Sequence, residues 1–137
     1  MSTVVVDTGV FSASLSRKRK SIAATYEKHI AGREIVVAYQ TVSEMRFGAL
    51  VAGWGESRLA ELERRIAFAQ IAVIDDAIIW THARLRFACC EAGHALAKAA
   101  HATDLWIATV AVHLDIPLVT YDNVFRGAPR LELVSEA

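Results

Sequence analysis

ATDLWIATVAVHLDIPLVTYD, residues 102–122, is the stretch of sequence that decides the fold. Counted from Asp104, apolar residues recur three, four, seven and eight positions later, which is the spacing of one helix face. We therefore predict a helix with Thr103 as its N-cap and Asp104 in its first turn, on the side that faces the core. Pro117 stops this helix, and the apolar residues after it predict a short buried strand that ends at Asp122. Taken alone, Asp104 is explained as an ordinary first-turn acid and Asp122 as an ordinary turn residue.

A second buried strand is predicted at the amino terminus, where residues 4–6 (VVV) form an apolar run without alternation. This run stops at Asp7. In open α/β sheets, ligands bind beyond the carboxyl ends of the strands, so Asp7, Asp104 and Asp122 are expected to converge at one edge of the sheet. Converging carboxylates repel one another and resist burial. Because a bound cation relieves that cost, the pattern predicts a cation site.

The middle of the chain supplies a candidate fourth acid. Residues 34–39, EIVVAY, predict a strand, and the helix after it begins near Thr41. Thr41 and Glu44 have the spacing of a capping box, which explains Glu44 as a local helix-start residue. Phe47 and Val51 share the helix face of Glu44, however, which predicts that this acid leans toward the core near the carboxyl end of a strand. We favour this second interpretation.

The remaining segments alternate between helix and strand. Helices are predicted at residues 10–15, 21–31, 56–69 and 75–92, and further strands at residues 71–74 and 131–134. The amphipathic helix at 56–69 is either partly exposed or a dimer face. Asp75 and Asp76 are assigned to helix capping. The alternation predicts a parallel, doubly wound α/β sheet in one domain that spans residues 1–137.

Composition limits the classes of function. The chain carries 15 acidic and 15 basic side chains, so its bulk charge gives no argument for binding nucleic acid. A local patch would have to supply that contact, and Arg17, Lys18, Arg19 and Lys20 form one. This basic run is explained equally well as a solvated loop and as an RNA contact near Asp7. No apolar run is long enough to span a bilayer and no signal-peptide pattern is present, so we expect a cytoplasmic protein without membrane contact.

Four segments of the chain resemble the PIN domain, and specifically the VapC-type ribonuclease toxins of type II toxin–antitoxin systems. They are VVVDTGVF at 4–11, SEMRFGAL at 43–50, DLWIATVA at 104–111 and PLVTYDNVF at 117–125. The resemblance implies a three-layer α/β fold with a central parallel sheet of about five strands flanked by helices. It also implies a Mg²⁺- or Mn²⁺-dependent endoribonuclease that cleaves RNA, forms a homodimer and is silenced by a cognate VapB-like antitoxin.

The chemistry of the acids agrees with this function. We assign as metal ligands and catalytic residues the four acids Asp7, Glu44, Asp104 and Asp122. Carboxylate oxygens suit hard cations such as Mg²⁺ or Mn²⁺, and a site without His or Cys argues against zinc. One or two such ions can orient a water, lower its pKa and stabilise charge on the phosphoryl oxygens. Thr8 and Thr120 are candidates for hydrogen bonds that orient the carboxylates.

Two other classes of function use an α/β fold of this kind. A catalytically silent PIN-fold interaction module would keep the fold without the chemistry, and metal-dependent cleavage of a panel of RNAs separates it from a nuclease. An α/β phosphotransfer domain is the other class. An aspartate-nucleophile phosphatase has a second Asp two residues after the first, where this chain has Gly9. A response-regulator receiver has a Lys late in the sheet, whereas the last lysine here is Lys98, before the predicted helix that carries Asp104.

Overall fold

The centre of the molecule is a parallel β-sheet. The structure is a computed structural model that describes residues 2–15 and 20–134. Its strands are β1 (Thr3–Val6), β2 (Glu34–Val37), β3 (Gln70–Ile71) and β4 (Leu118–Val119). They pair in parallel in the order β3-β2-β1-β4. Because β1 and β4 are neighbours although they come from opposite ends of the chain, the residues that follow these two strands meet at one edge of the sheet.

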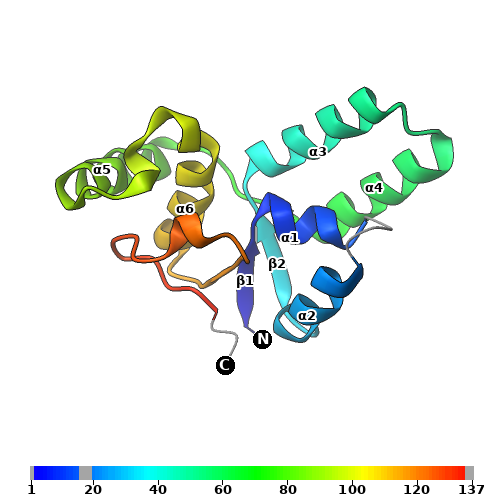
Figure 1. Cartoon of the computed structure of the whole chain (residues 1–137), viewed down its shortest axis with the longest axis horizontal. Helices are drawn as coiled ribbons and strands as arrows, with labels where there is room; N and C mark the ends of the chain where they lie inside the picture. Colours follow the sequence, from blue (N-terminus) through cyan, green and yellow to red (C-terminus); the bar gives the residue numbers. More distant parts are fainter. Residues whose placement is uncertain (1, 16–19, 135–137) are drawn as a thin grey trace.

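Helices cover both faces of this sheet (Figure 1). They are α1 (Thr8–Ala13), α2 (Lys20–Ile30), α3 (Tyr39–Ala52), α4 (Glu56–Phe68), α5 (Asp76–Ala92) and α6 (Ala102–Leu114), with short 3-10 helices η1 (Ala95–Ala97), η2 (Ala99–His101) and η3 (Asn123–Phe125). Helices α5 and α6 lie on one side of β1 and β2, and α1 to α4 lie on the other. The result is the predicted three-layer α/β architecture.

The apolar run of β1 lies between two hydrophobic clusters. Val5 belongs to the cluster built with α5 and α6, whereas Val4 and Val6 belong to the cluster built with α1 to α4. All three side chains are at most 1% exposed. A strand that is covered on both faces needs apolar residues at every position, which explains why this segment lacks the alternation of a half-exposed strand.

The strands differ from the prediction at their ends. The strand predicted at 34–39 is wrong beyond Val37, because Tyr39 is already the first residue of α3. The strand predicted at 71–74 is wrong in its bounds, since β3 is Gln70–Ile71. In place of an edge strand at 131–134, Leu133 forms a single parallel bridge with Leu118. The described sheet therefore has four strands and this bridge, close to the expected five.

The predicted helices are present, but two of the predicted caps are wrong. Thr103 lies inside α6, whose N-cap is His101, and Thr41 lies inside α3, whose N-cap is Ala38. Asp75 does cap α5, because its carboxylate accepts a hydrogen bond from the backbone N of Ile78 at 3.0 Å. Among the described residues, no helix is both long and apolar enough to cross a membrane.

The basic run falls outside the described residues. The structure does not describe residues 16–19, and it describes Lys20 only as the first backbone position of α2. The RNA contact suggested for Arg17, Lys18, Arg19 and Lys20 therefore stays a prediction from the sequence.

Candidate active site at the carboxyl edge of the sheet

Asp7 lies at the centre of this edge, directly after β1. It is the N-cap of α1, and 5% of its surface is exposed. Its Oδ1 accepts a hydrogen bond from the backbone N of Val10 at 2.9 Å. Its Oδ2 accepts one from the hydroxyl of Thr120, the residue after β4. The parallel pairing of β1 with β4 brings Thr120 to this position, so Val10 of α1 and Thr120 after β4 together hold the Asp7 carboxylate.

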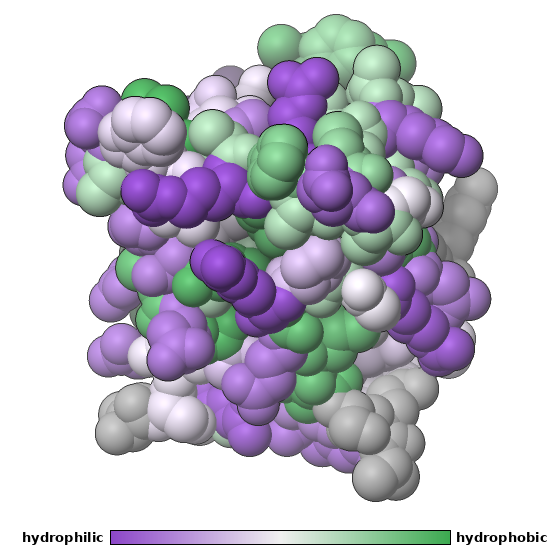
Figure 2. Space-filling model, turned by 90° about the vertical axis from the view of Figure 1, so that its left-hand side faces the viewer, coloured by the Kyte–Doolittle hydropathy of each residue, from purple (hydrophilic) through white to green (hydrophobic). Residues whose placement is uncertain are grey.

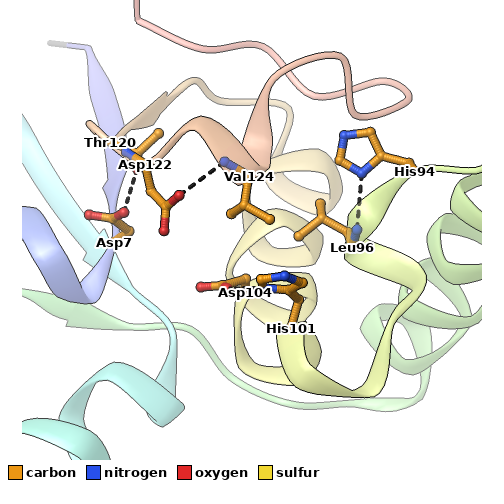
Figure 3. Close-up of polar contacts among 8 residues, drawn as sticks. All are labelled: Asp7, His94, Leu96, His101, Asp104, Thr120, Asp122 and Val124. Atoms are coloured by element: carbon orange, nitrogen blue, oxygen red, sulfur yellow. Dashed lines mark hydrogen bonds and ion pairs between the residues drawn. The ribbon is translucent and has the colours of Figure 1, made fainter.

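Asp104 and Asp122 come to the same place from α6 and from the loop after β4. Asp104 lies in the first turn of α6, and its Oδ2 is 3.2 Å from Nδ1 of His101. Asp122 is the N-cap of η3, and its Oδ1 accepts a hydrogen bond from the backbone N of Val124 at 3.0 Å. Figure 3 shows the carboxylates of Asp7, Asp104 and Asp122 turned toward one common space. The predicted convergence of these three acids is therefore present in the fold.

Burial and mutual repulsion both act on these carboxylates. The pKa of Asp7 is raised from 3.8 to about 6, chiefly by burial. The hydrogen bonds from Thr120 and Val10 oppose this rise, and the charges of Asp122 and Asp104 add to it. Burial likewise raises the pKa of Asp104, the hydrogen bond with His101 lowers it, and the charge of Asp122 raises it again. The negative charges in this set therefore disfavour the ionised forms of Asp7 and Asp104.

Glu44 approaches the site in a different way from the one predicted. The side of α3 that faces the core carries Thr41, Val42, Met45 and Ala49, whereas Glu44 is exposed. Phe47 and Val51, its neighbours on the helix surface, are 67% and 71% exposed, so the prediction that this face leans toward the core is wrong.

A hydrogen-bond chain nevertheless connects Glu44 to the edge that carries Asp7. The hydroxyl of Thr8, the residue after Asp7, donates a hydrogen bond to Oε1 of Glu44 at 2.8 Å. The same hydroxyl is 3.0 Å from Oγ1 of Thr41, which is fully buried. The sequence pattern predicted Thr41 only as a helix cap and did not reveal this contact, because it is the packing of α1 against α3 that brings Thr41 to Thr8.

The donor set fits a hard divalent cation in its chemistry. The acids offer only oxygen ligands, and burial and neighbouring negative charge raise the pKa values of Asp7 and Asp104, a cost that a cation would relieve. Among the described residues, however, no group of three or more His, Cys, Asp or Glu side chains is close enough to hold a metal ion as it stands. The structure therefore shows a convergent set of carboxylates and not a closed ligand shell.

In the described part of the chain, hollows border Glu44 and Asp122, and a further one lies against the helix that carries Asp104. One of about 240 Å³ lies beside Glu44 and is lined by Met45, Trp54 and Arg58 among others. A second, of about 340 Å³, includes Thr120 and Asp122 in its wall. A third, of about 290 Å³, includes Ala102 and Leu105, the helical neighbours of Asp104. Hollow surface therefore adjoins two of the assigned acids, Glu44 and Asp122.

Comparison with known proteins agrees with this architecture. A family model described as PIN domain matches residues 4–131. Ribonuclease VapC5 of Mycobacterium tuberculosis is 32% identical over 137 residues, which cover 95% of this chain and 93% of that protein. The crystal structure of the toxin–antitoxin system VapBC-5 from Mycobacterium tuberculosis matches with a TM-score of 0.68 at 31% identity, over 98% of each chain. VapBC2 from Rickettsia felis, bound to a DNA fragment from its promoter, matches with a TM-score of 0.78 at 18% identity, over 96% of this chain and 97% of that one. At 18% identity, the match to VapBC2 shows similarity of the fold alone.

Proposed function

This chain belongs to the PIN-domain family and is a homologue of a VapC ribonuclease, and from that premise we propose that it is a Mg²⁺- or Mn²⁺-dependent endoribonuclease, the toxin of a toxin–antitoxin pair. The observation that carries the proposal is the convergence of Asp7, Asp104 and Asp122 at the carboxyl edge of the sheet. Structural acids are ordinarily spread over a surface or paired with cations. Acids that converge and raise one another's pKa are instead typical of a functional site, here one that works with a bound cation.

The roles of the side chains follow from their surroundings. Asp7, Asp104, Asp122 and Glu44 would hold the cation. A divalent ion bound there supplies an activated water and stabilises negative charge on the phosphoryl oxygens. Asp7 is the buried member, and Thr120 and Val10 fix its two oxygens. Asp122 and Glu44 are exposed and can adjust to the cation. The hydroxyl of Thr8 donates a hydrogen bond to Glu44.

RNA cleavage tests this function directly. The purified protein is incubated with a panel of single-stranded and structured RNAs, with EDTA, Mg²⁺ or Mn²⁺. We expect cleavage with either ion and none with EDTA. A folded protein that binds RNA or an antitoxin but cleaves no RNA under any of these conditions would support the alternative function, a catalytically silent interaction module.

Thr120 has a role that a pH profile can detect. Its hydrogen bond lowers the pKa of Asp7, so Thr120→Val is expected to raise that pKa. At limiting Mn²⁺, where protons compete with the ion for Asp7, the acid limb of the cleavage profile should move up by about one pH unit. Thr25→Val is the matched control, because the hydroxyl of Thr25 bonds within α2, to the backbone O of Ser21. An unchanged pH profile of cleavage would show that Thr120 is not part of the site.

The proposed partners are a VapB-like antitoxin and a second copy of the chain. The solved structures that match include toxin–antitoxin complexes, and one relative among them is above 30% identical, which supports an antitoxin partner.

The exposed apolar side chains on the outer face of α3 support a homodimer. Phe47, Leu50 and Val51 are 67%, 75% and 71% exposed. Phe47 and Leu50 border a hollow of about 500 Å³ that Tyr39 and Ile71 also line. We place the toxin, its antitoxin and the ribonuclease activity in the cytoplasm.

Leu50→Glu is expected to convert the homodimer to a monomer. The substitution removes apolar burial worth about 2 kcal/mol and adds a charge to the contact, so dissociation should become at least about thirtyfold easier. Light scattering at micromolar concentration measures the result. Leu114→Glu, at the end of α6 and 43% exposed, is the matched control and should stay dimeric. A parent protein that is monomeric without its antitoxin would contradict the assignment.

A further inference from the structure

We propose that the hollow between α5 and the start of α6 is a phosphate-binding subsite, in which Arg86 and Lys98 hold the RNA backbone on the other side of the α6 start from the cleavage site. The hollow has a volume of about 290 Å³. The proposal rests on the ribonuclease function proposed above and names residues that position its substrate. None of the four assigned acids is among the described residues that line this hollow.

The lining of the hollow suits an anion that carries a flat group. Its polar members are His82, Arg86 and Lys98, and Asp and Glu are absent from its described lining. Trp106 and His82 form its aromatic part, with ring centroids 3.9 Å apart and planes at 14°. Leu96, Leu105 and alanines make up the rest. Cations beside an aromatic surface are the combination with which proteins bind single-stranded nucleic acid.

The two cations lack acidic partners within the described part of the chain. Neither Arg86 nor Lys98 has an ion pair there, whereas Arg46 is paired with Glu63 at 2.7 Å. Burial lowers the pKa of His82, and the neighbouring charge of Arg86 lowers it further. Isolated surface cations are usually only solvated. These two differ because they border one hollow whose described lining offers no negative charge to balance them.

The position of the hollow connects it to the acids. Ala102 and Leu105 line it, and Asp104 lies between them in the first turn of the same helix. Asp104 faces Asp7 and Asp122, so one helical turn has the carboxylates on one side and the hollow on the other. Figure 2 looks onto the side of the molecule where α5 lies and shows hydrophilic side chains lying across hydrophobic surface. An RNA strand with its scissile phosphate at the acids would therefore pass the start of α6 before a later phosphate reaches Arg86 and Lys98.

The test is the salt dependence of RNA binding. Binding of a single-stranded RNA is measured in EDTA, which prevents cleavage, for the parent and for the double variant Arg86→Gln, Lys98→Gln. Each phosphate contact on a single strand contributes about 0.7 to the slope of log K against log salt. The double variant is therefore expected to bind more weakly, with a slope smaller by about 1.4. In the presence of Mn²⁺, its KM for cleavage should rise more than its kcat falls.

The matched control removes two other exposed cations, as Arg64→Gln, Arg84→Gln, which lie on α4 and on α5 outside the hollow. It should keep the slope of the parent. Equal slopes for the parent and the Arg86, Lys98 variant, or equal losses in both double variants, would overturn the subsite. A loss of antitoxin binding with unchanged RNA binding would assign the hollow to an acidic peptide and would overturn it too. A parent that neither binds nor cleaves RNA would instead refute the proposed function, and the subsite with it. Thermal melts confirm that each variant is folded.

Discussion

Asp7→Asn is expected to abolish metal-dependent RNA cleavage and, at the same time, to stabilise the metal-free protein above pH 6. Cleavage should fall by more than about a hundredfold, because even groups that only support a metal ligand cost roughly 10- to 100-fold when removed. The gain in stability comes from the same carboxylate. Its folded-state pKa of about 6, against an ordinary value of 3.8, means that ionisation at neutral pH works against folding. The difference of about 2 corresponds to about 3 kcal/mol.

The direction of the pH dependence follows from the raised pKa. The folded protein binds the Asp7 proton more tightly than the unfolded chain does, so the parent loses stability as pH rises from 3.8 to about 6. The amide introduced by Asp7→Asn has no proton to lose, and its oxygen can still accept the hydrogen bond from Val10. The variant should therefore match the parent near pH 4 and exceed it by about 2–3 kcal/mol at about pH 7.5.

Urea unfolding in EDTA at a series of pH values from about 4 to about 7.5 measures this difference. Asp115→Asn is the matched control, since Asp115 is an exposed acid that ends α6 at a φ of 54°, a conformation that Asn tolerates well. Its unfolding free energy should follow the parent at every pH. If the unfolding free energy of Asp7→Asn also follows the parent at every pH, the raised pKa of the buried Asp7 carboxylate is refuted. If the variant still cleaves RNA, Asp7 is not part of the catalytic site.

Mn²⁺ is expected to stabilise the parent and to have much less effect on Asp104→Asn. A ligand that binds only the folded state adds about 2.7 kcal/mol at a hundredfold excess over its Kd. In the parent, a bound ion would replace the repulsion among Asp7, Asp104 and Asp122 by attraction. Asp104→Asn keeps the shape of the side chain and removes one of the charges. It should be somewhat more stable than the parent in EDTA and should bind the ion more weakly.

Thermal melts in EDTA and in a series of Mn²⁺ concentrations decide this prediction. Asp115→Asn again serves as the control and should respond to Mn²⁺ as the parent does. Two outcomes contradict the site: no metal-dependent shift in the parent, or equal shifts in the parent and Asp104→Asn. The readout needs no RNA, so it tests the cation site separately from the nuclease activity.

Much of this site could be predicted from the sequence because the predictive patterns are local. The unbroken apolar run before Asp7 identifies a strand covered on both faces, and the helical spacing after Asp104 identifies the inner face of α6. Parallel strands in a doubly wound sheet have their carboxyl ends at one edge. The sequence therefore predicts that Asp7 and Asp122 lie at one edge of the sheet, and the pairing of β1 with β4 in the structure makes them neighbours.

The tertiary structure decided what depends on neighbours from distant parts of the chain. The periodicity of α3 placed Glu44 toward the core, but the packing of this helix turns Thr41 and Met45 inward and leaves Glu44 exposed, in contact with Thr8. The elevated pKa of Asp7 likewise arises from burial by several elements at once. The hollow at Arg86 and Lys98 exists only where α5 meets α6. A sequence pattern identifies the faces of one element, whereas burial and charge at a site depend on which other elements pack against those faces.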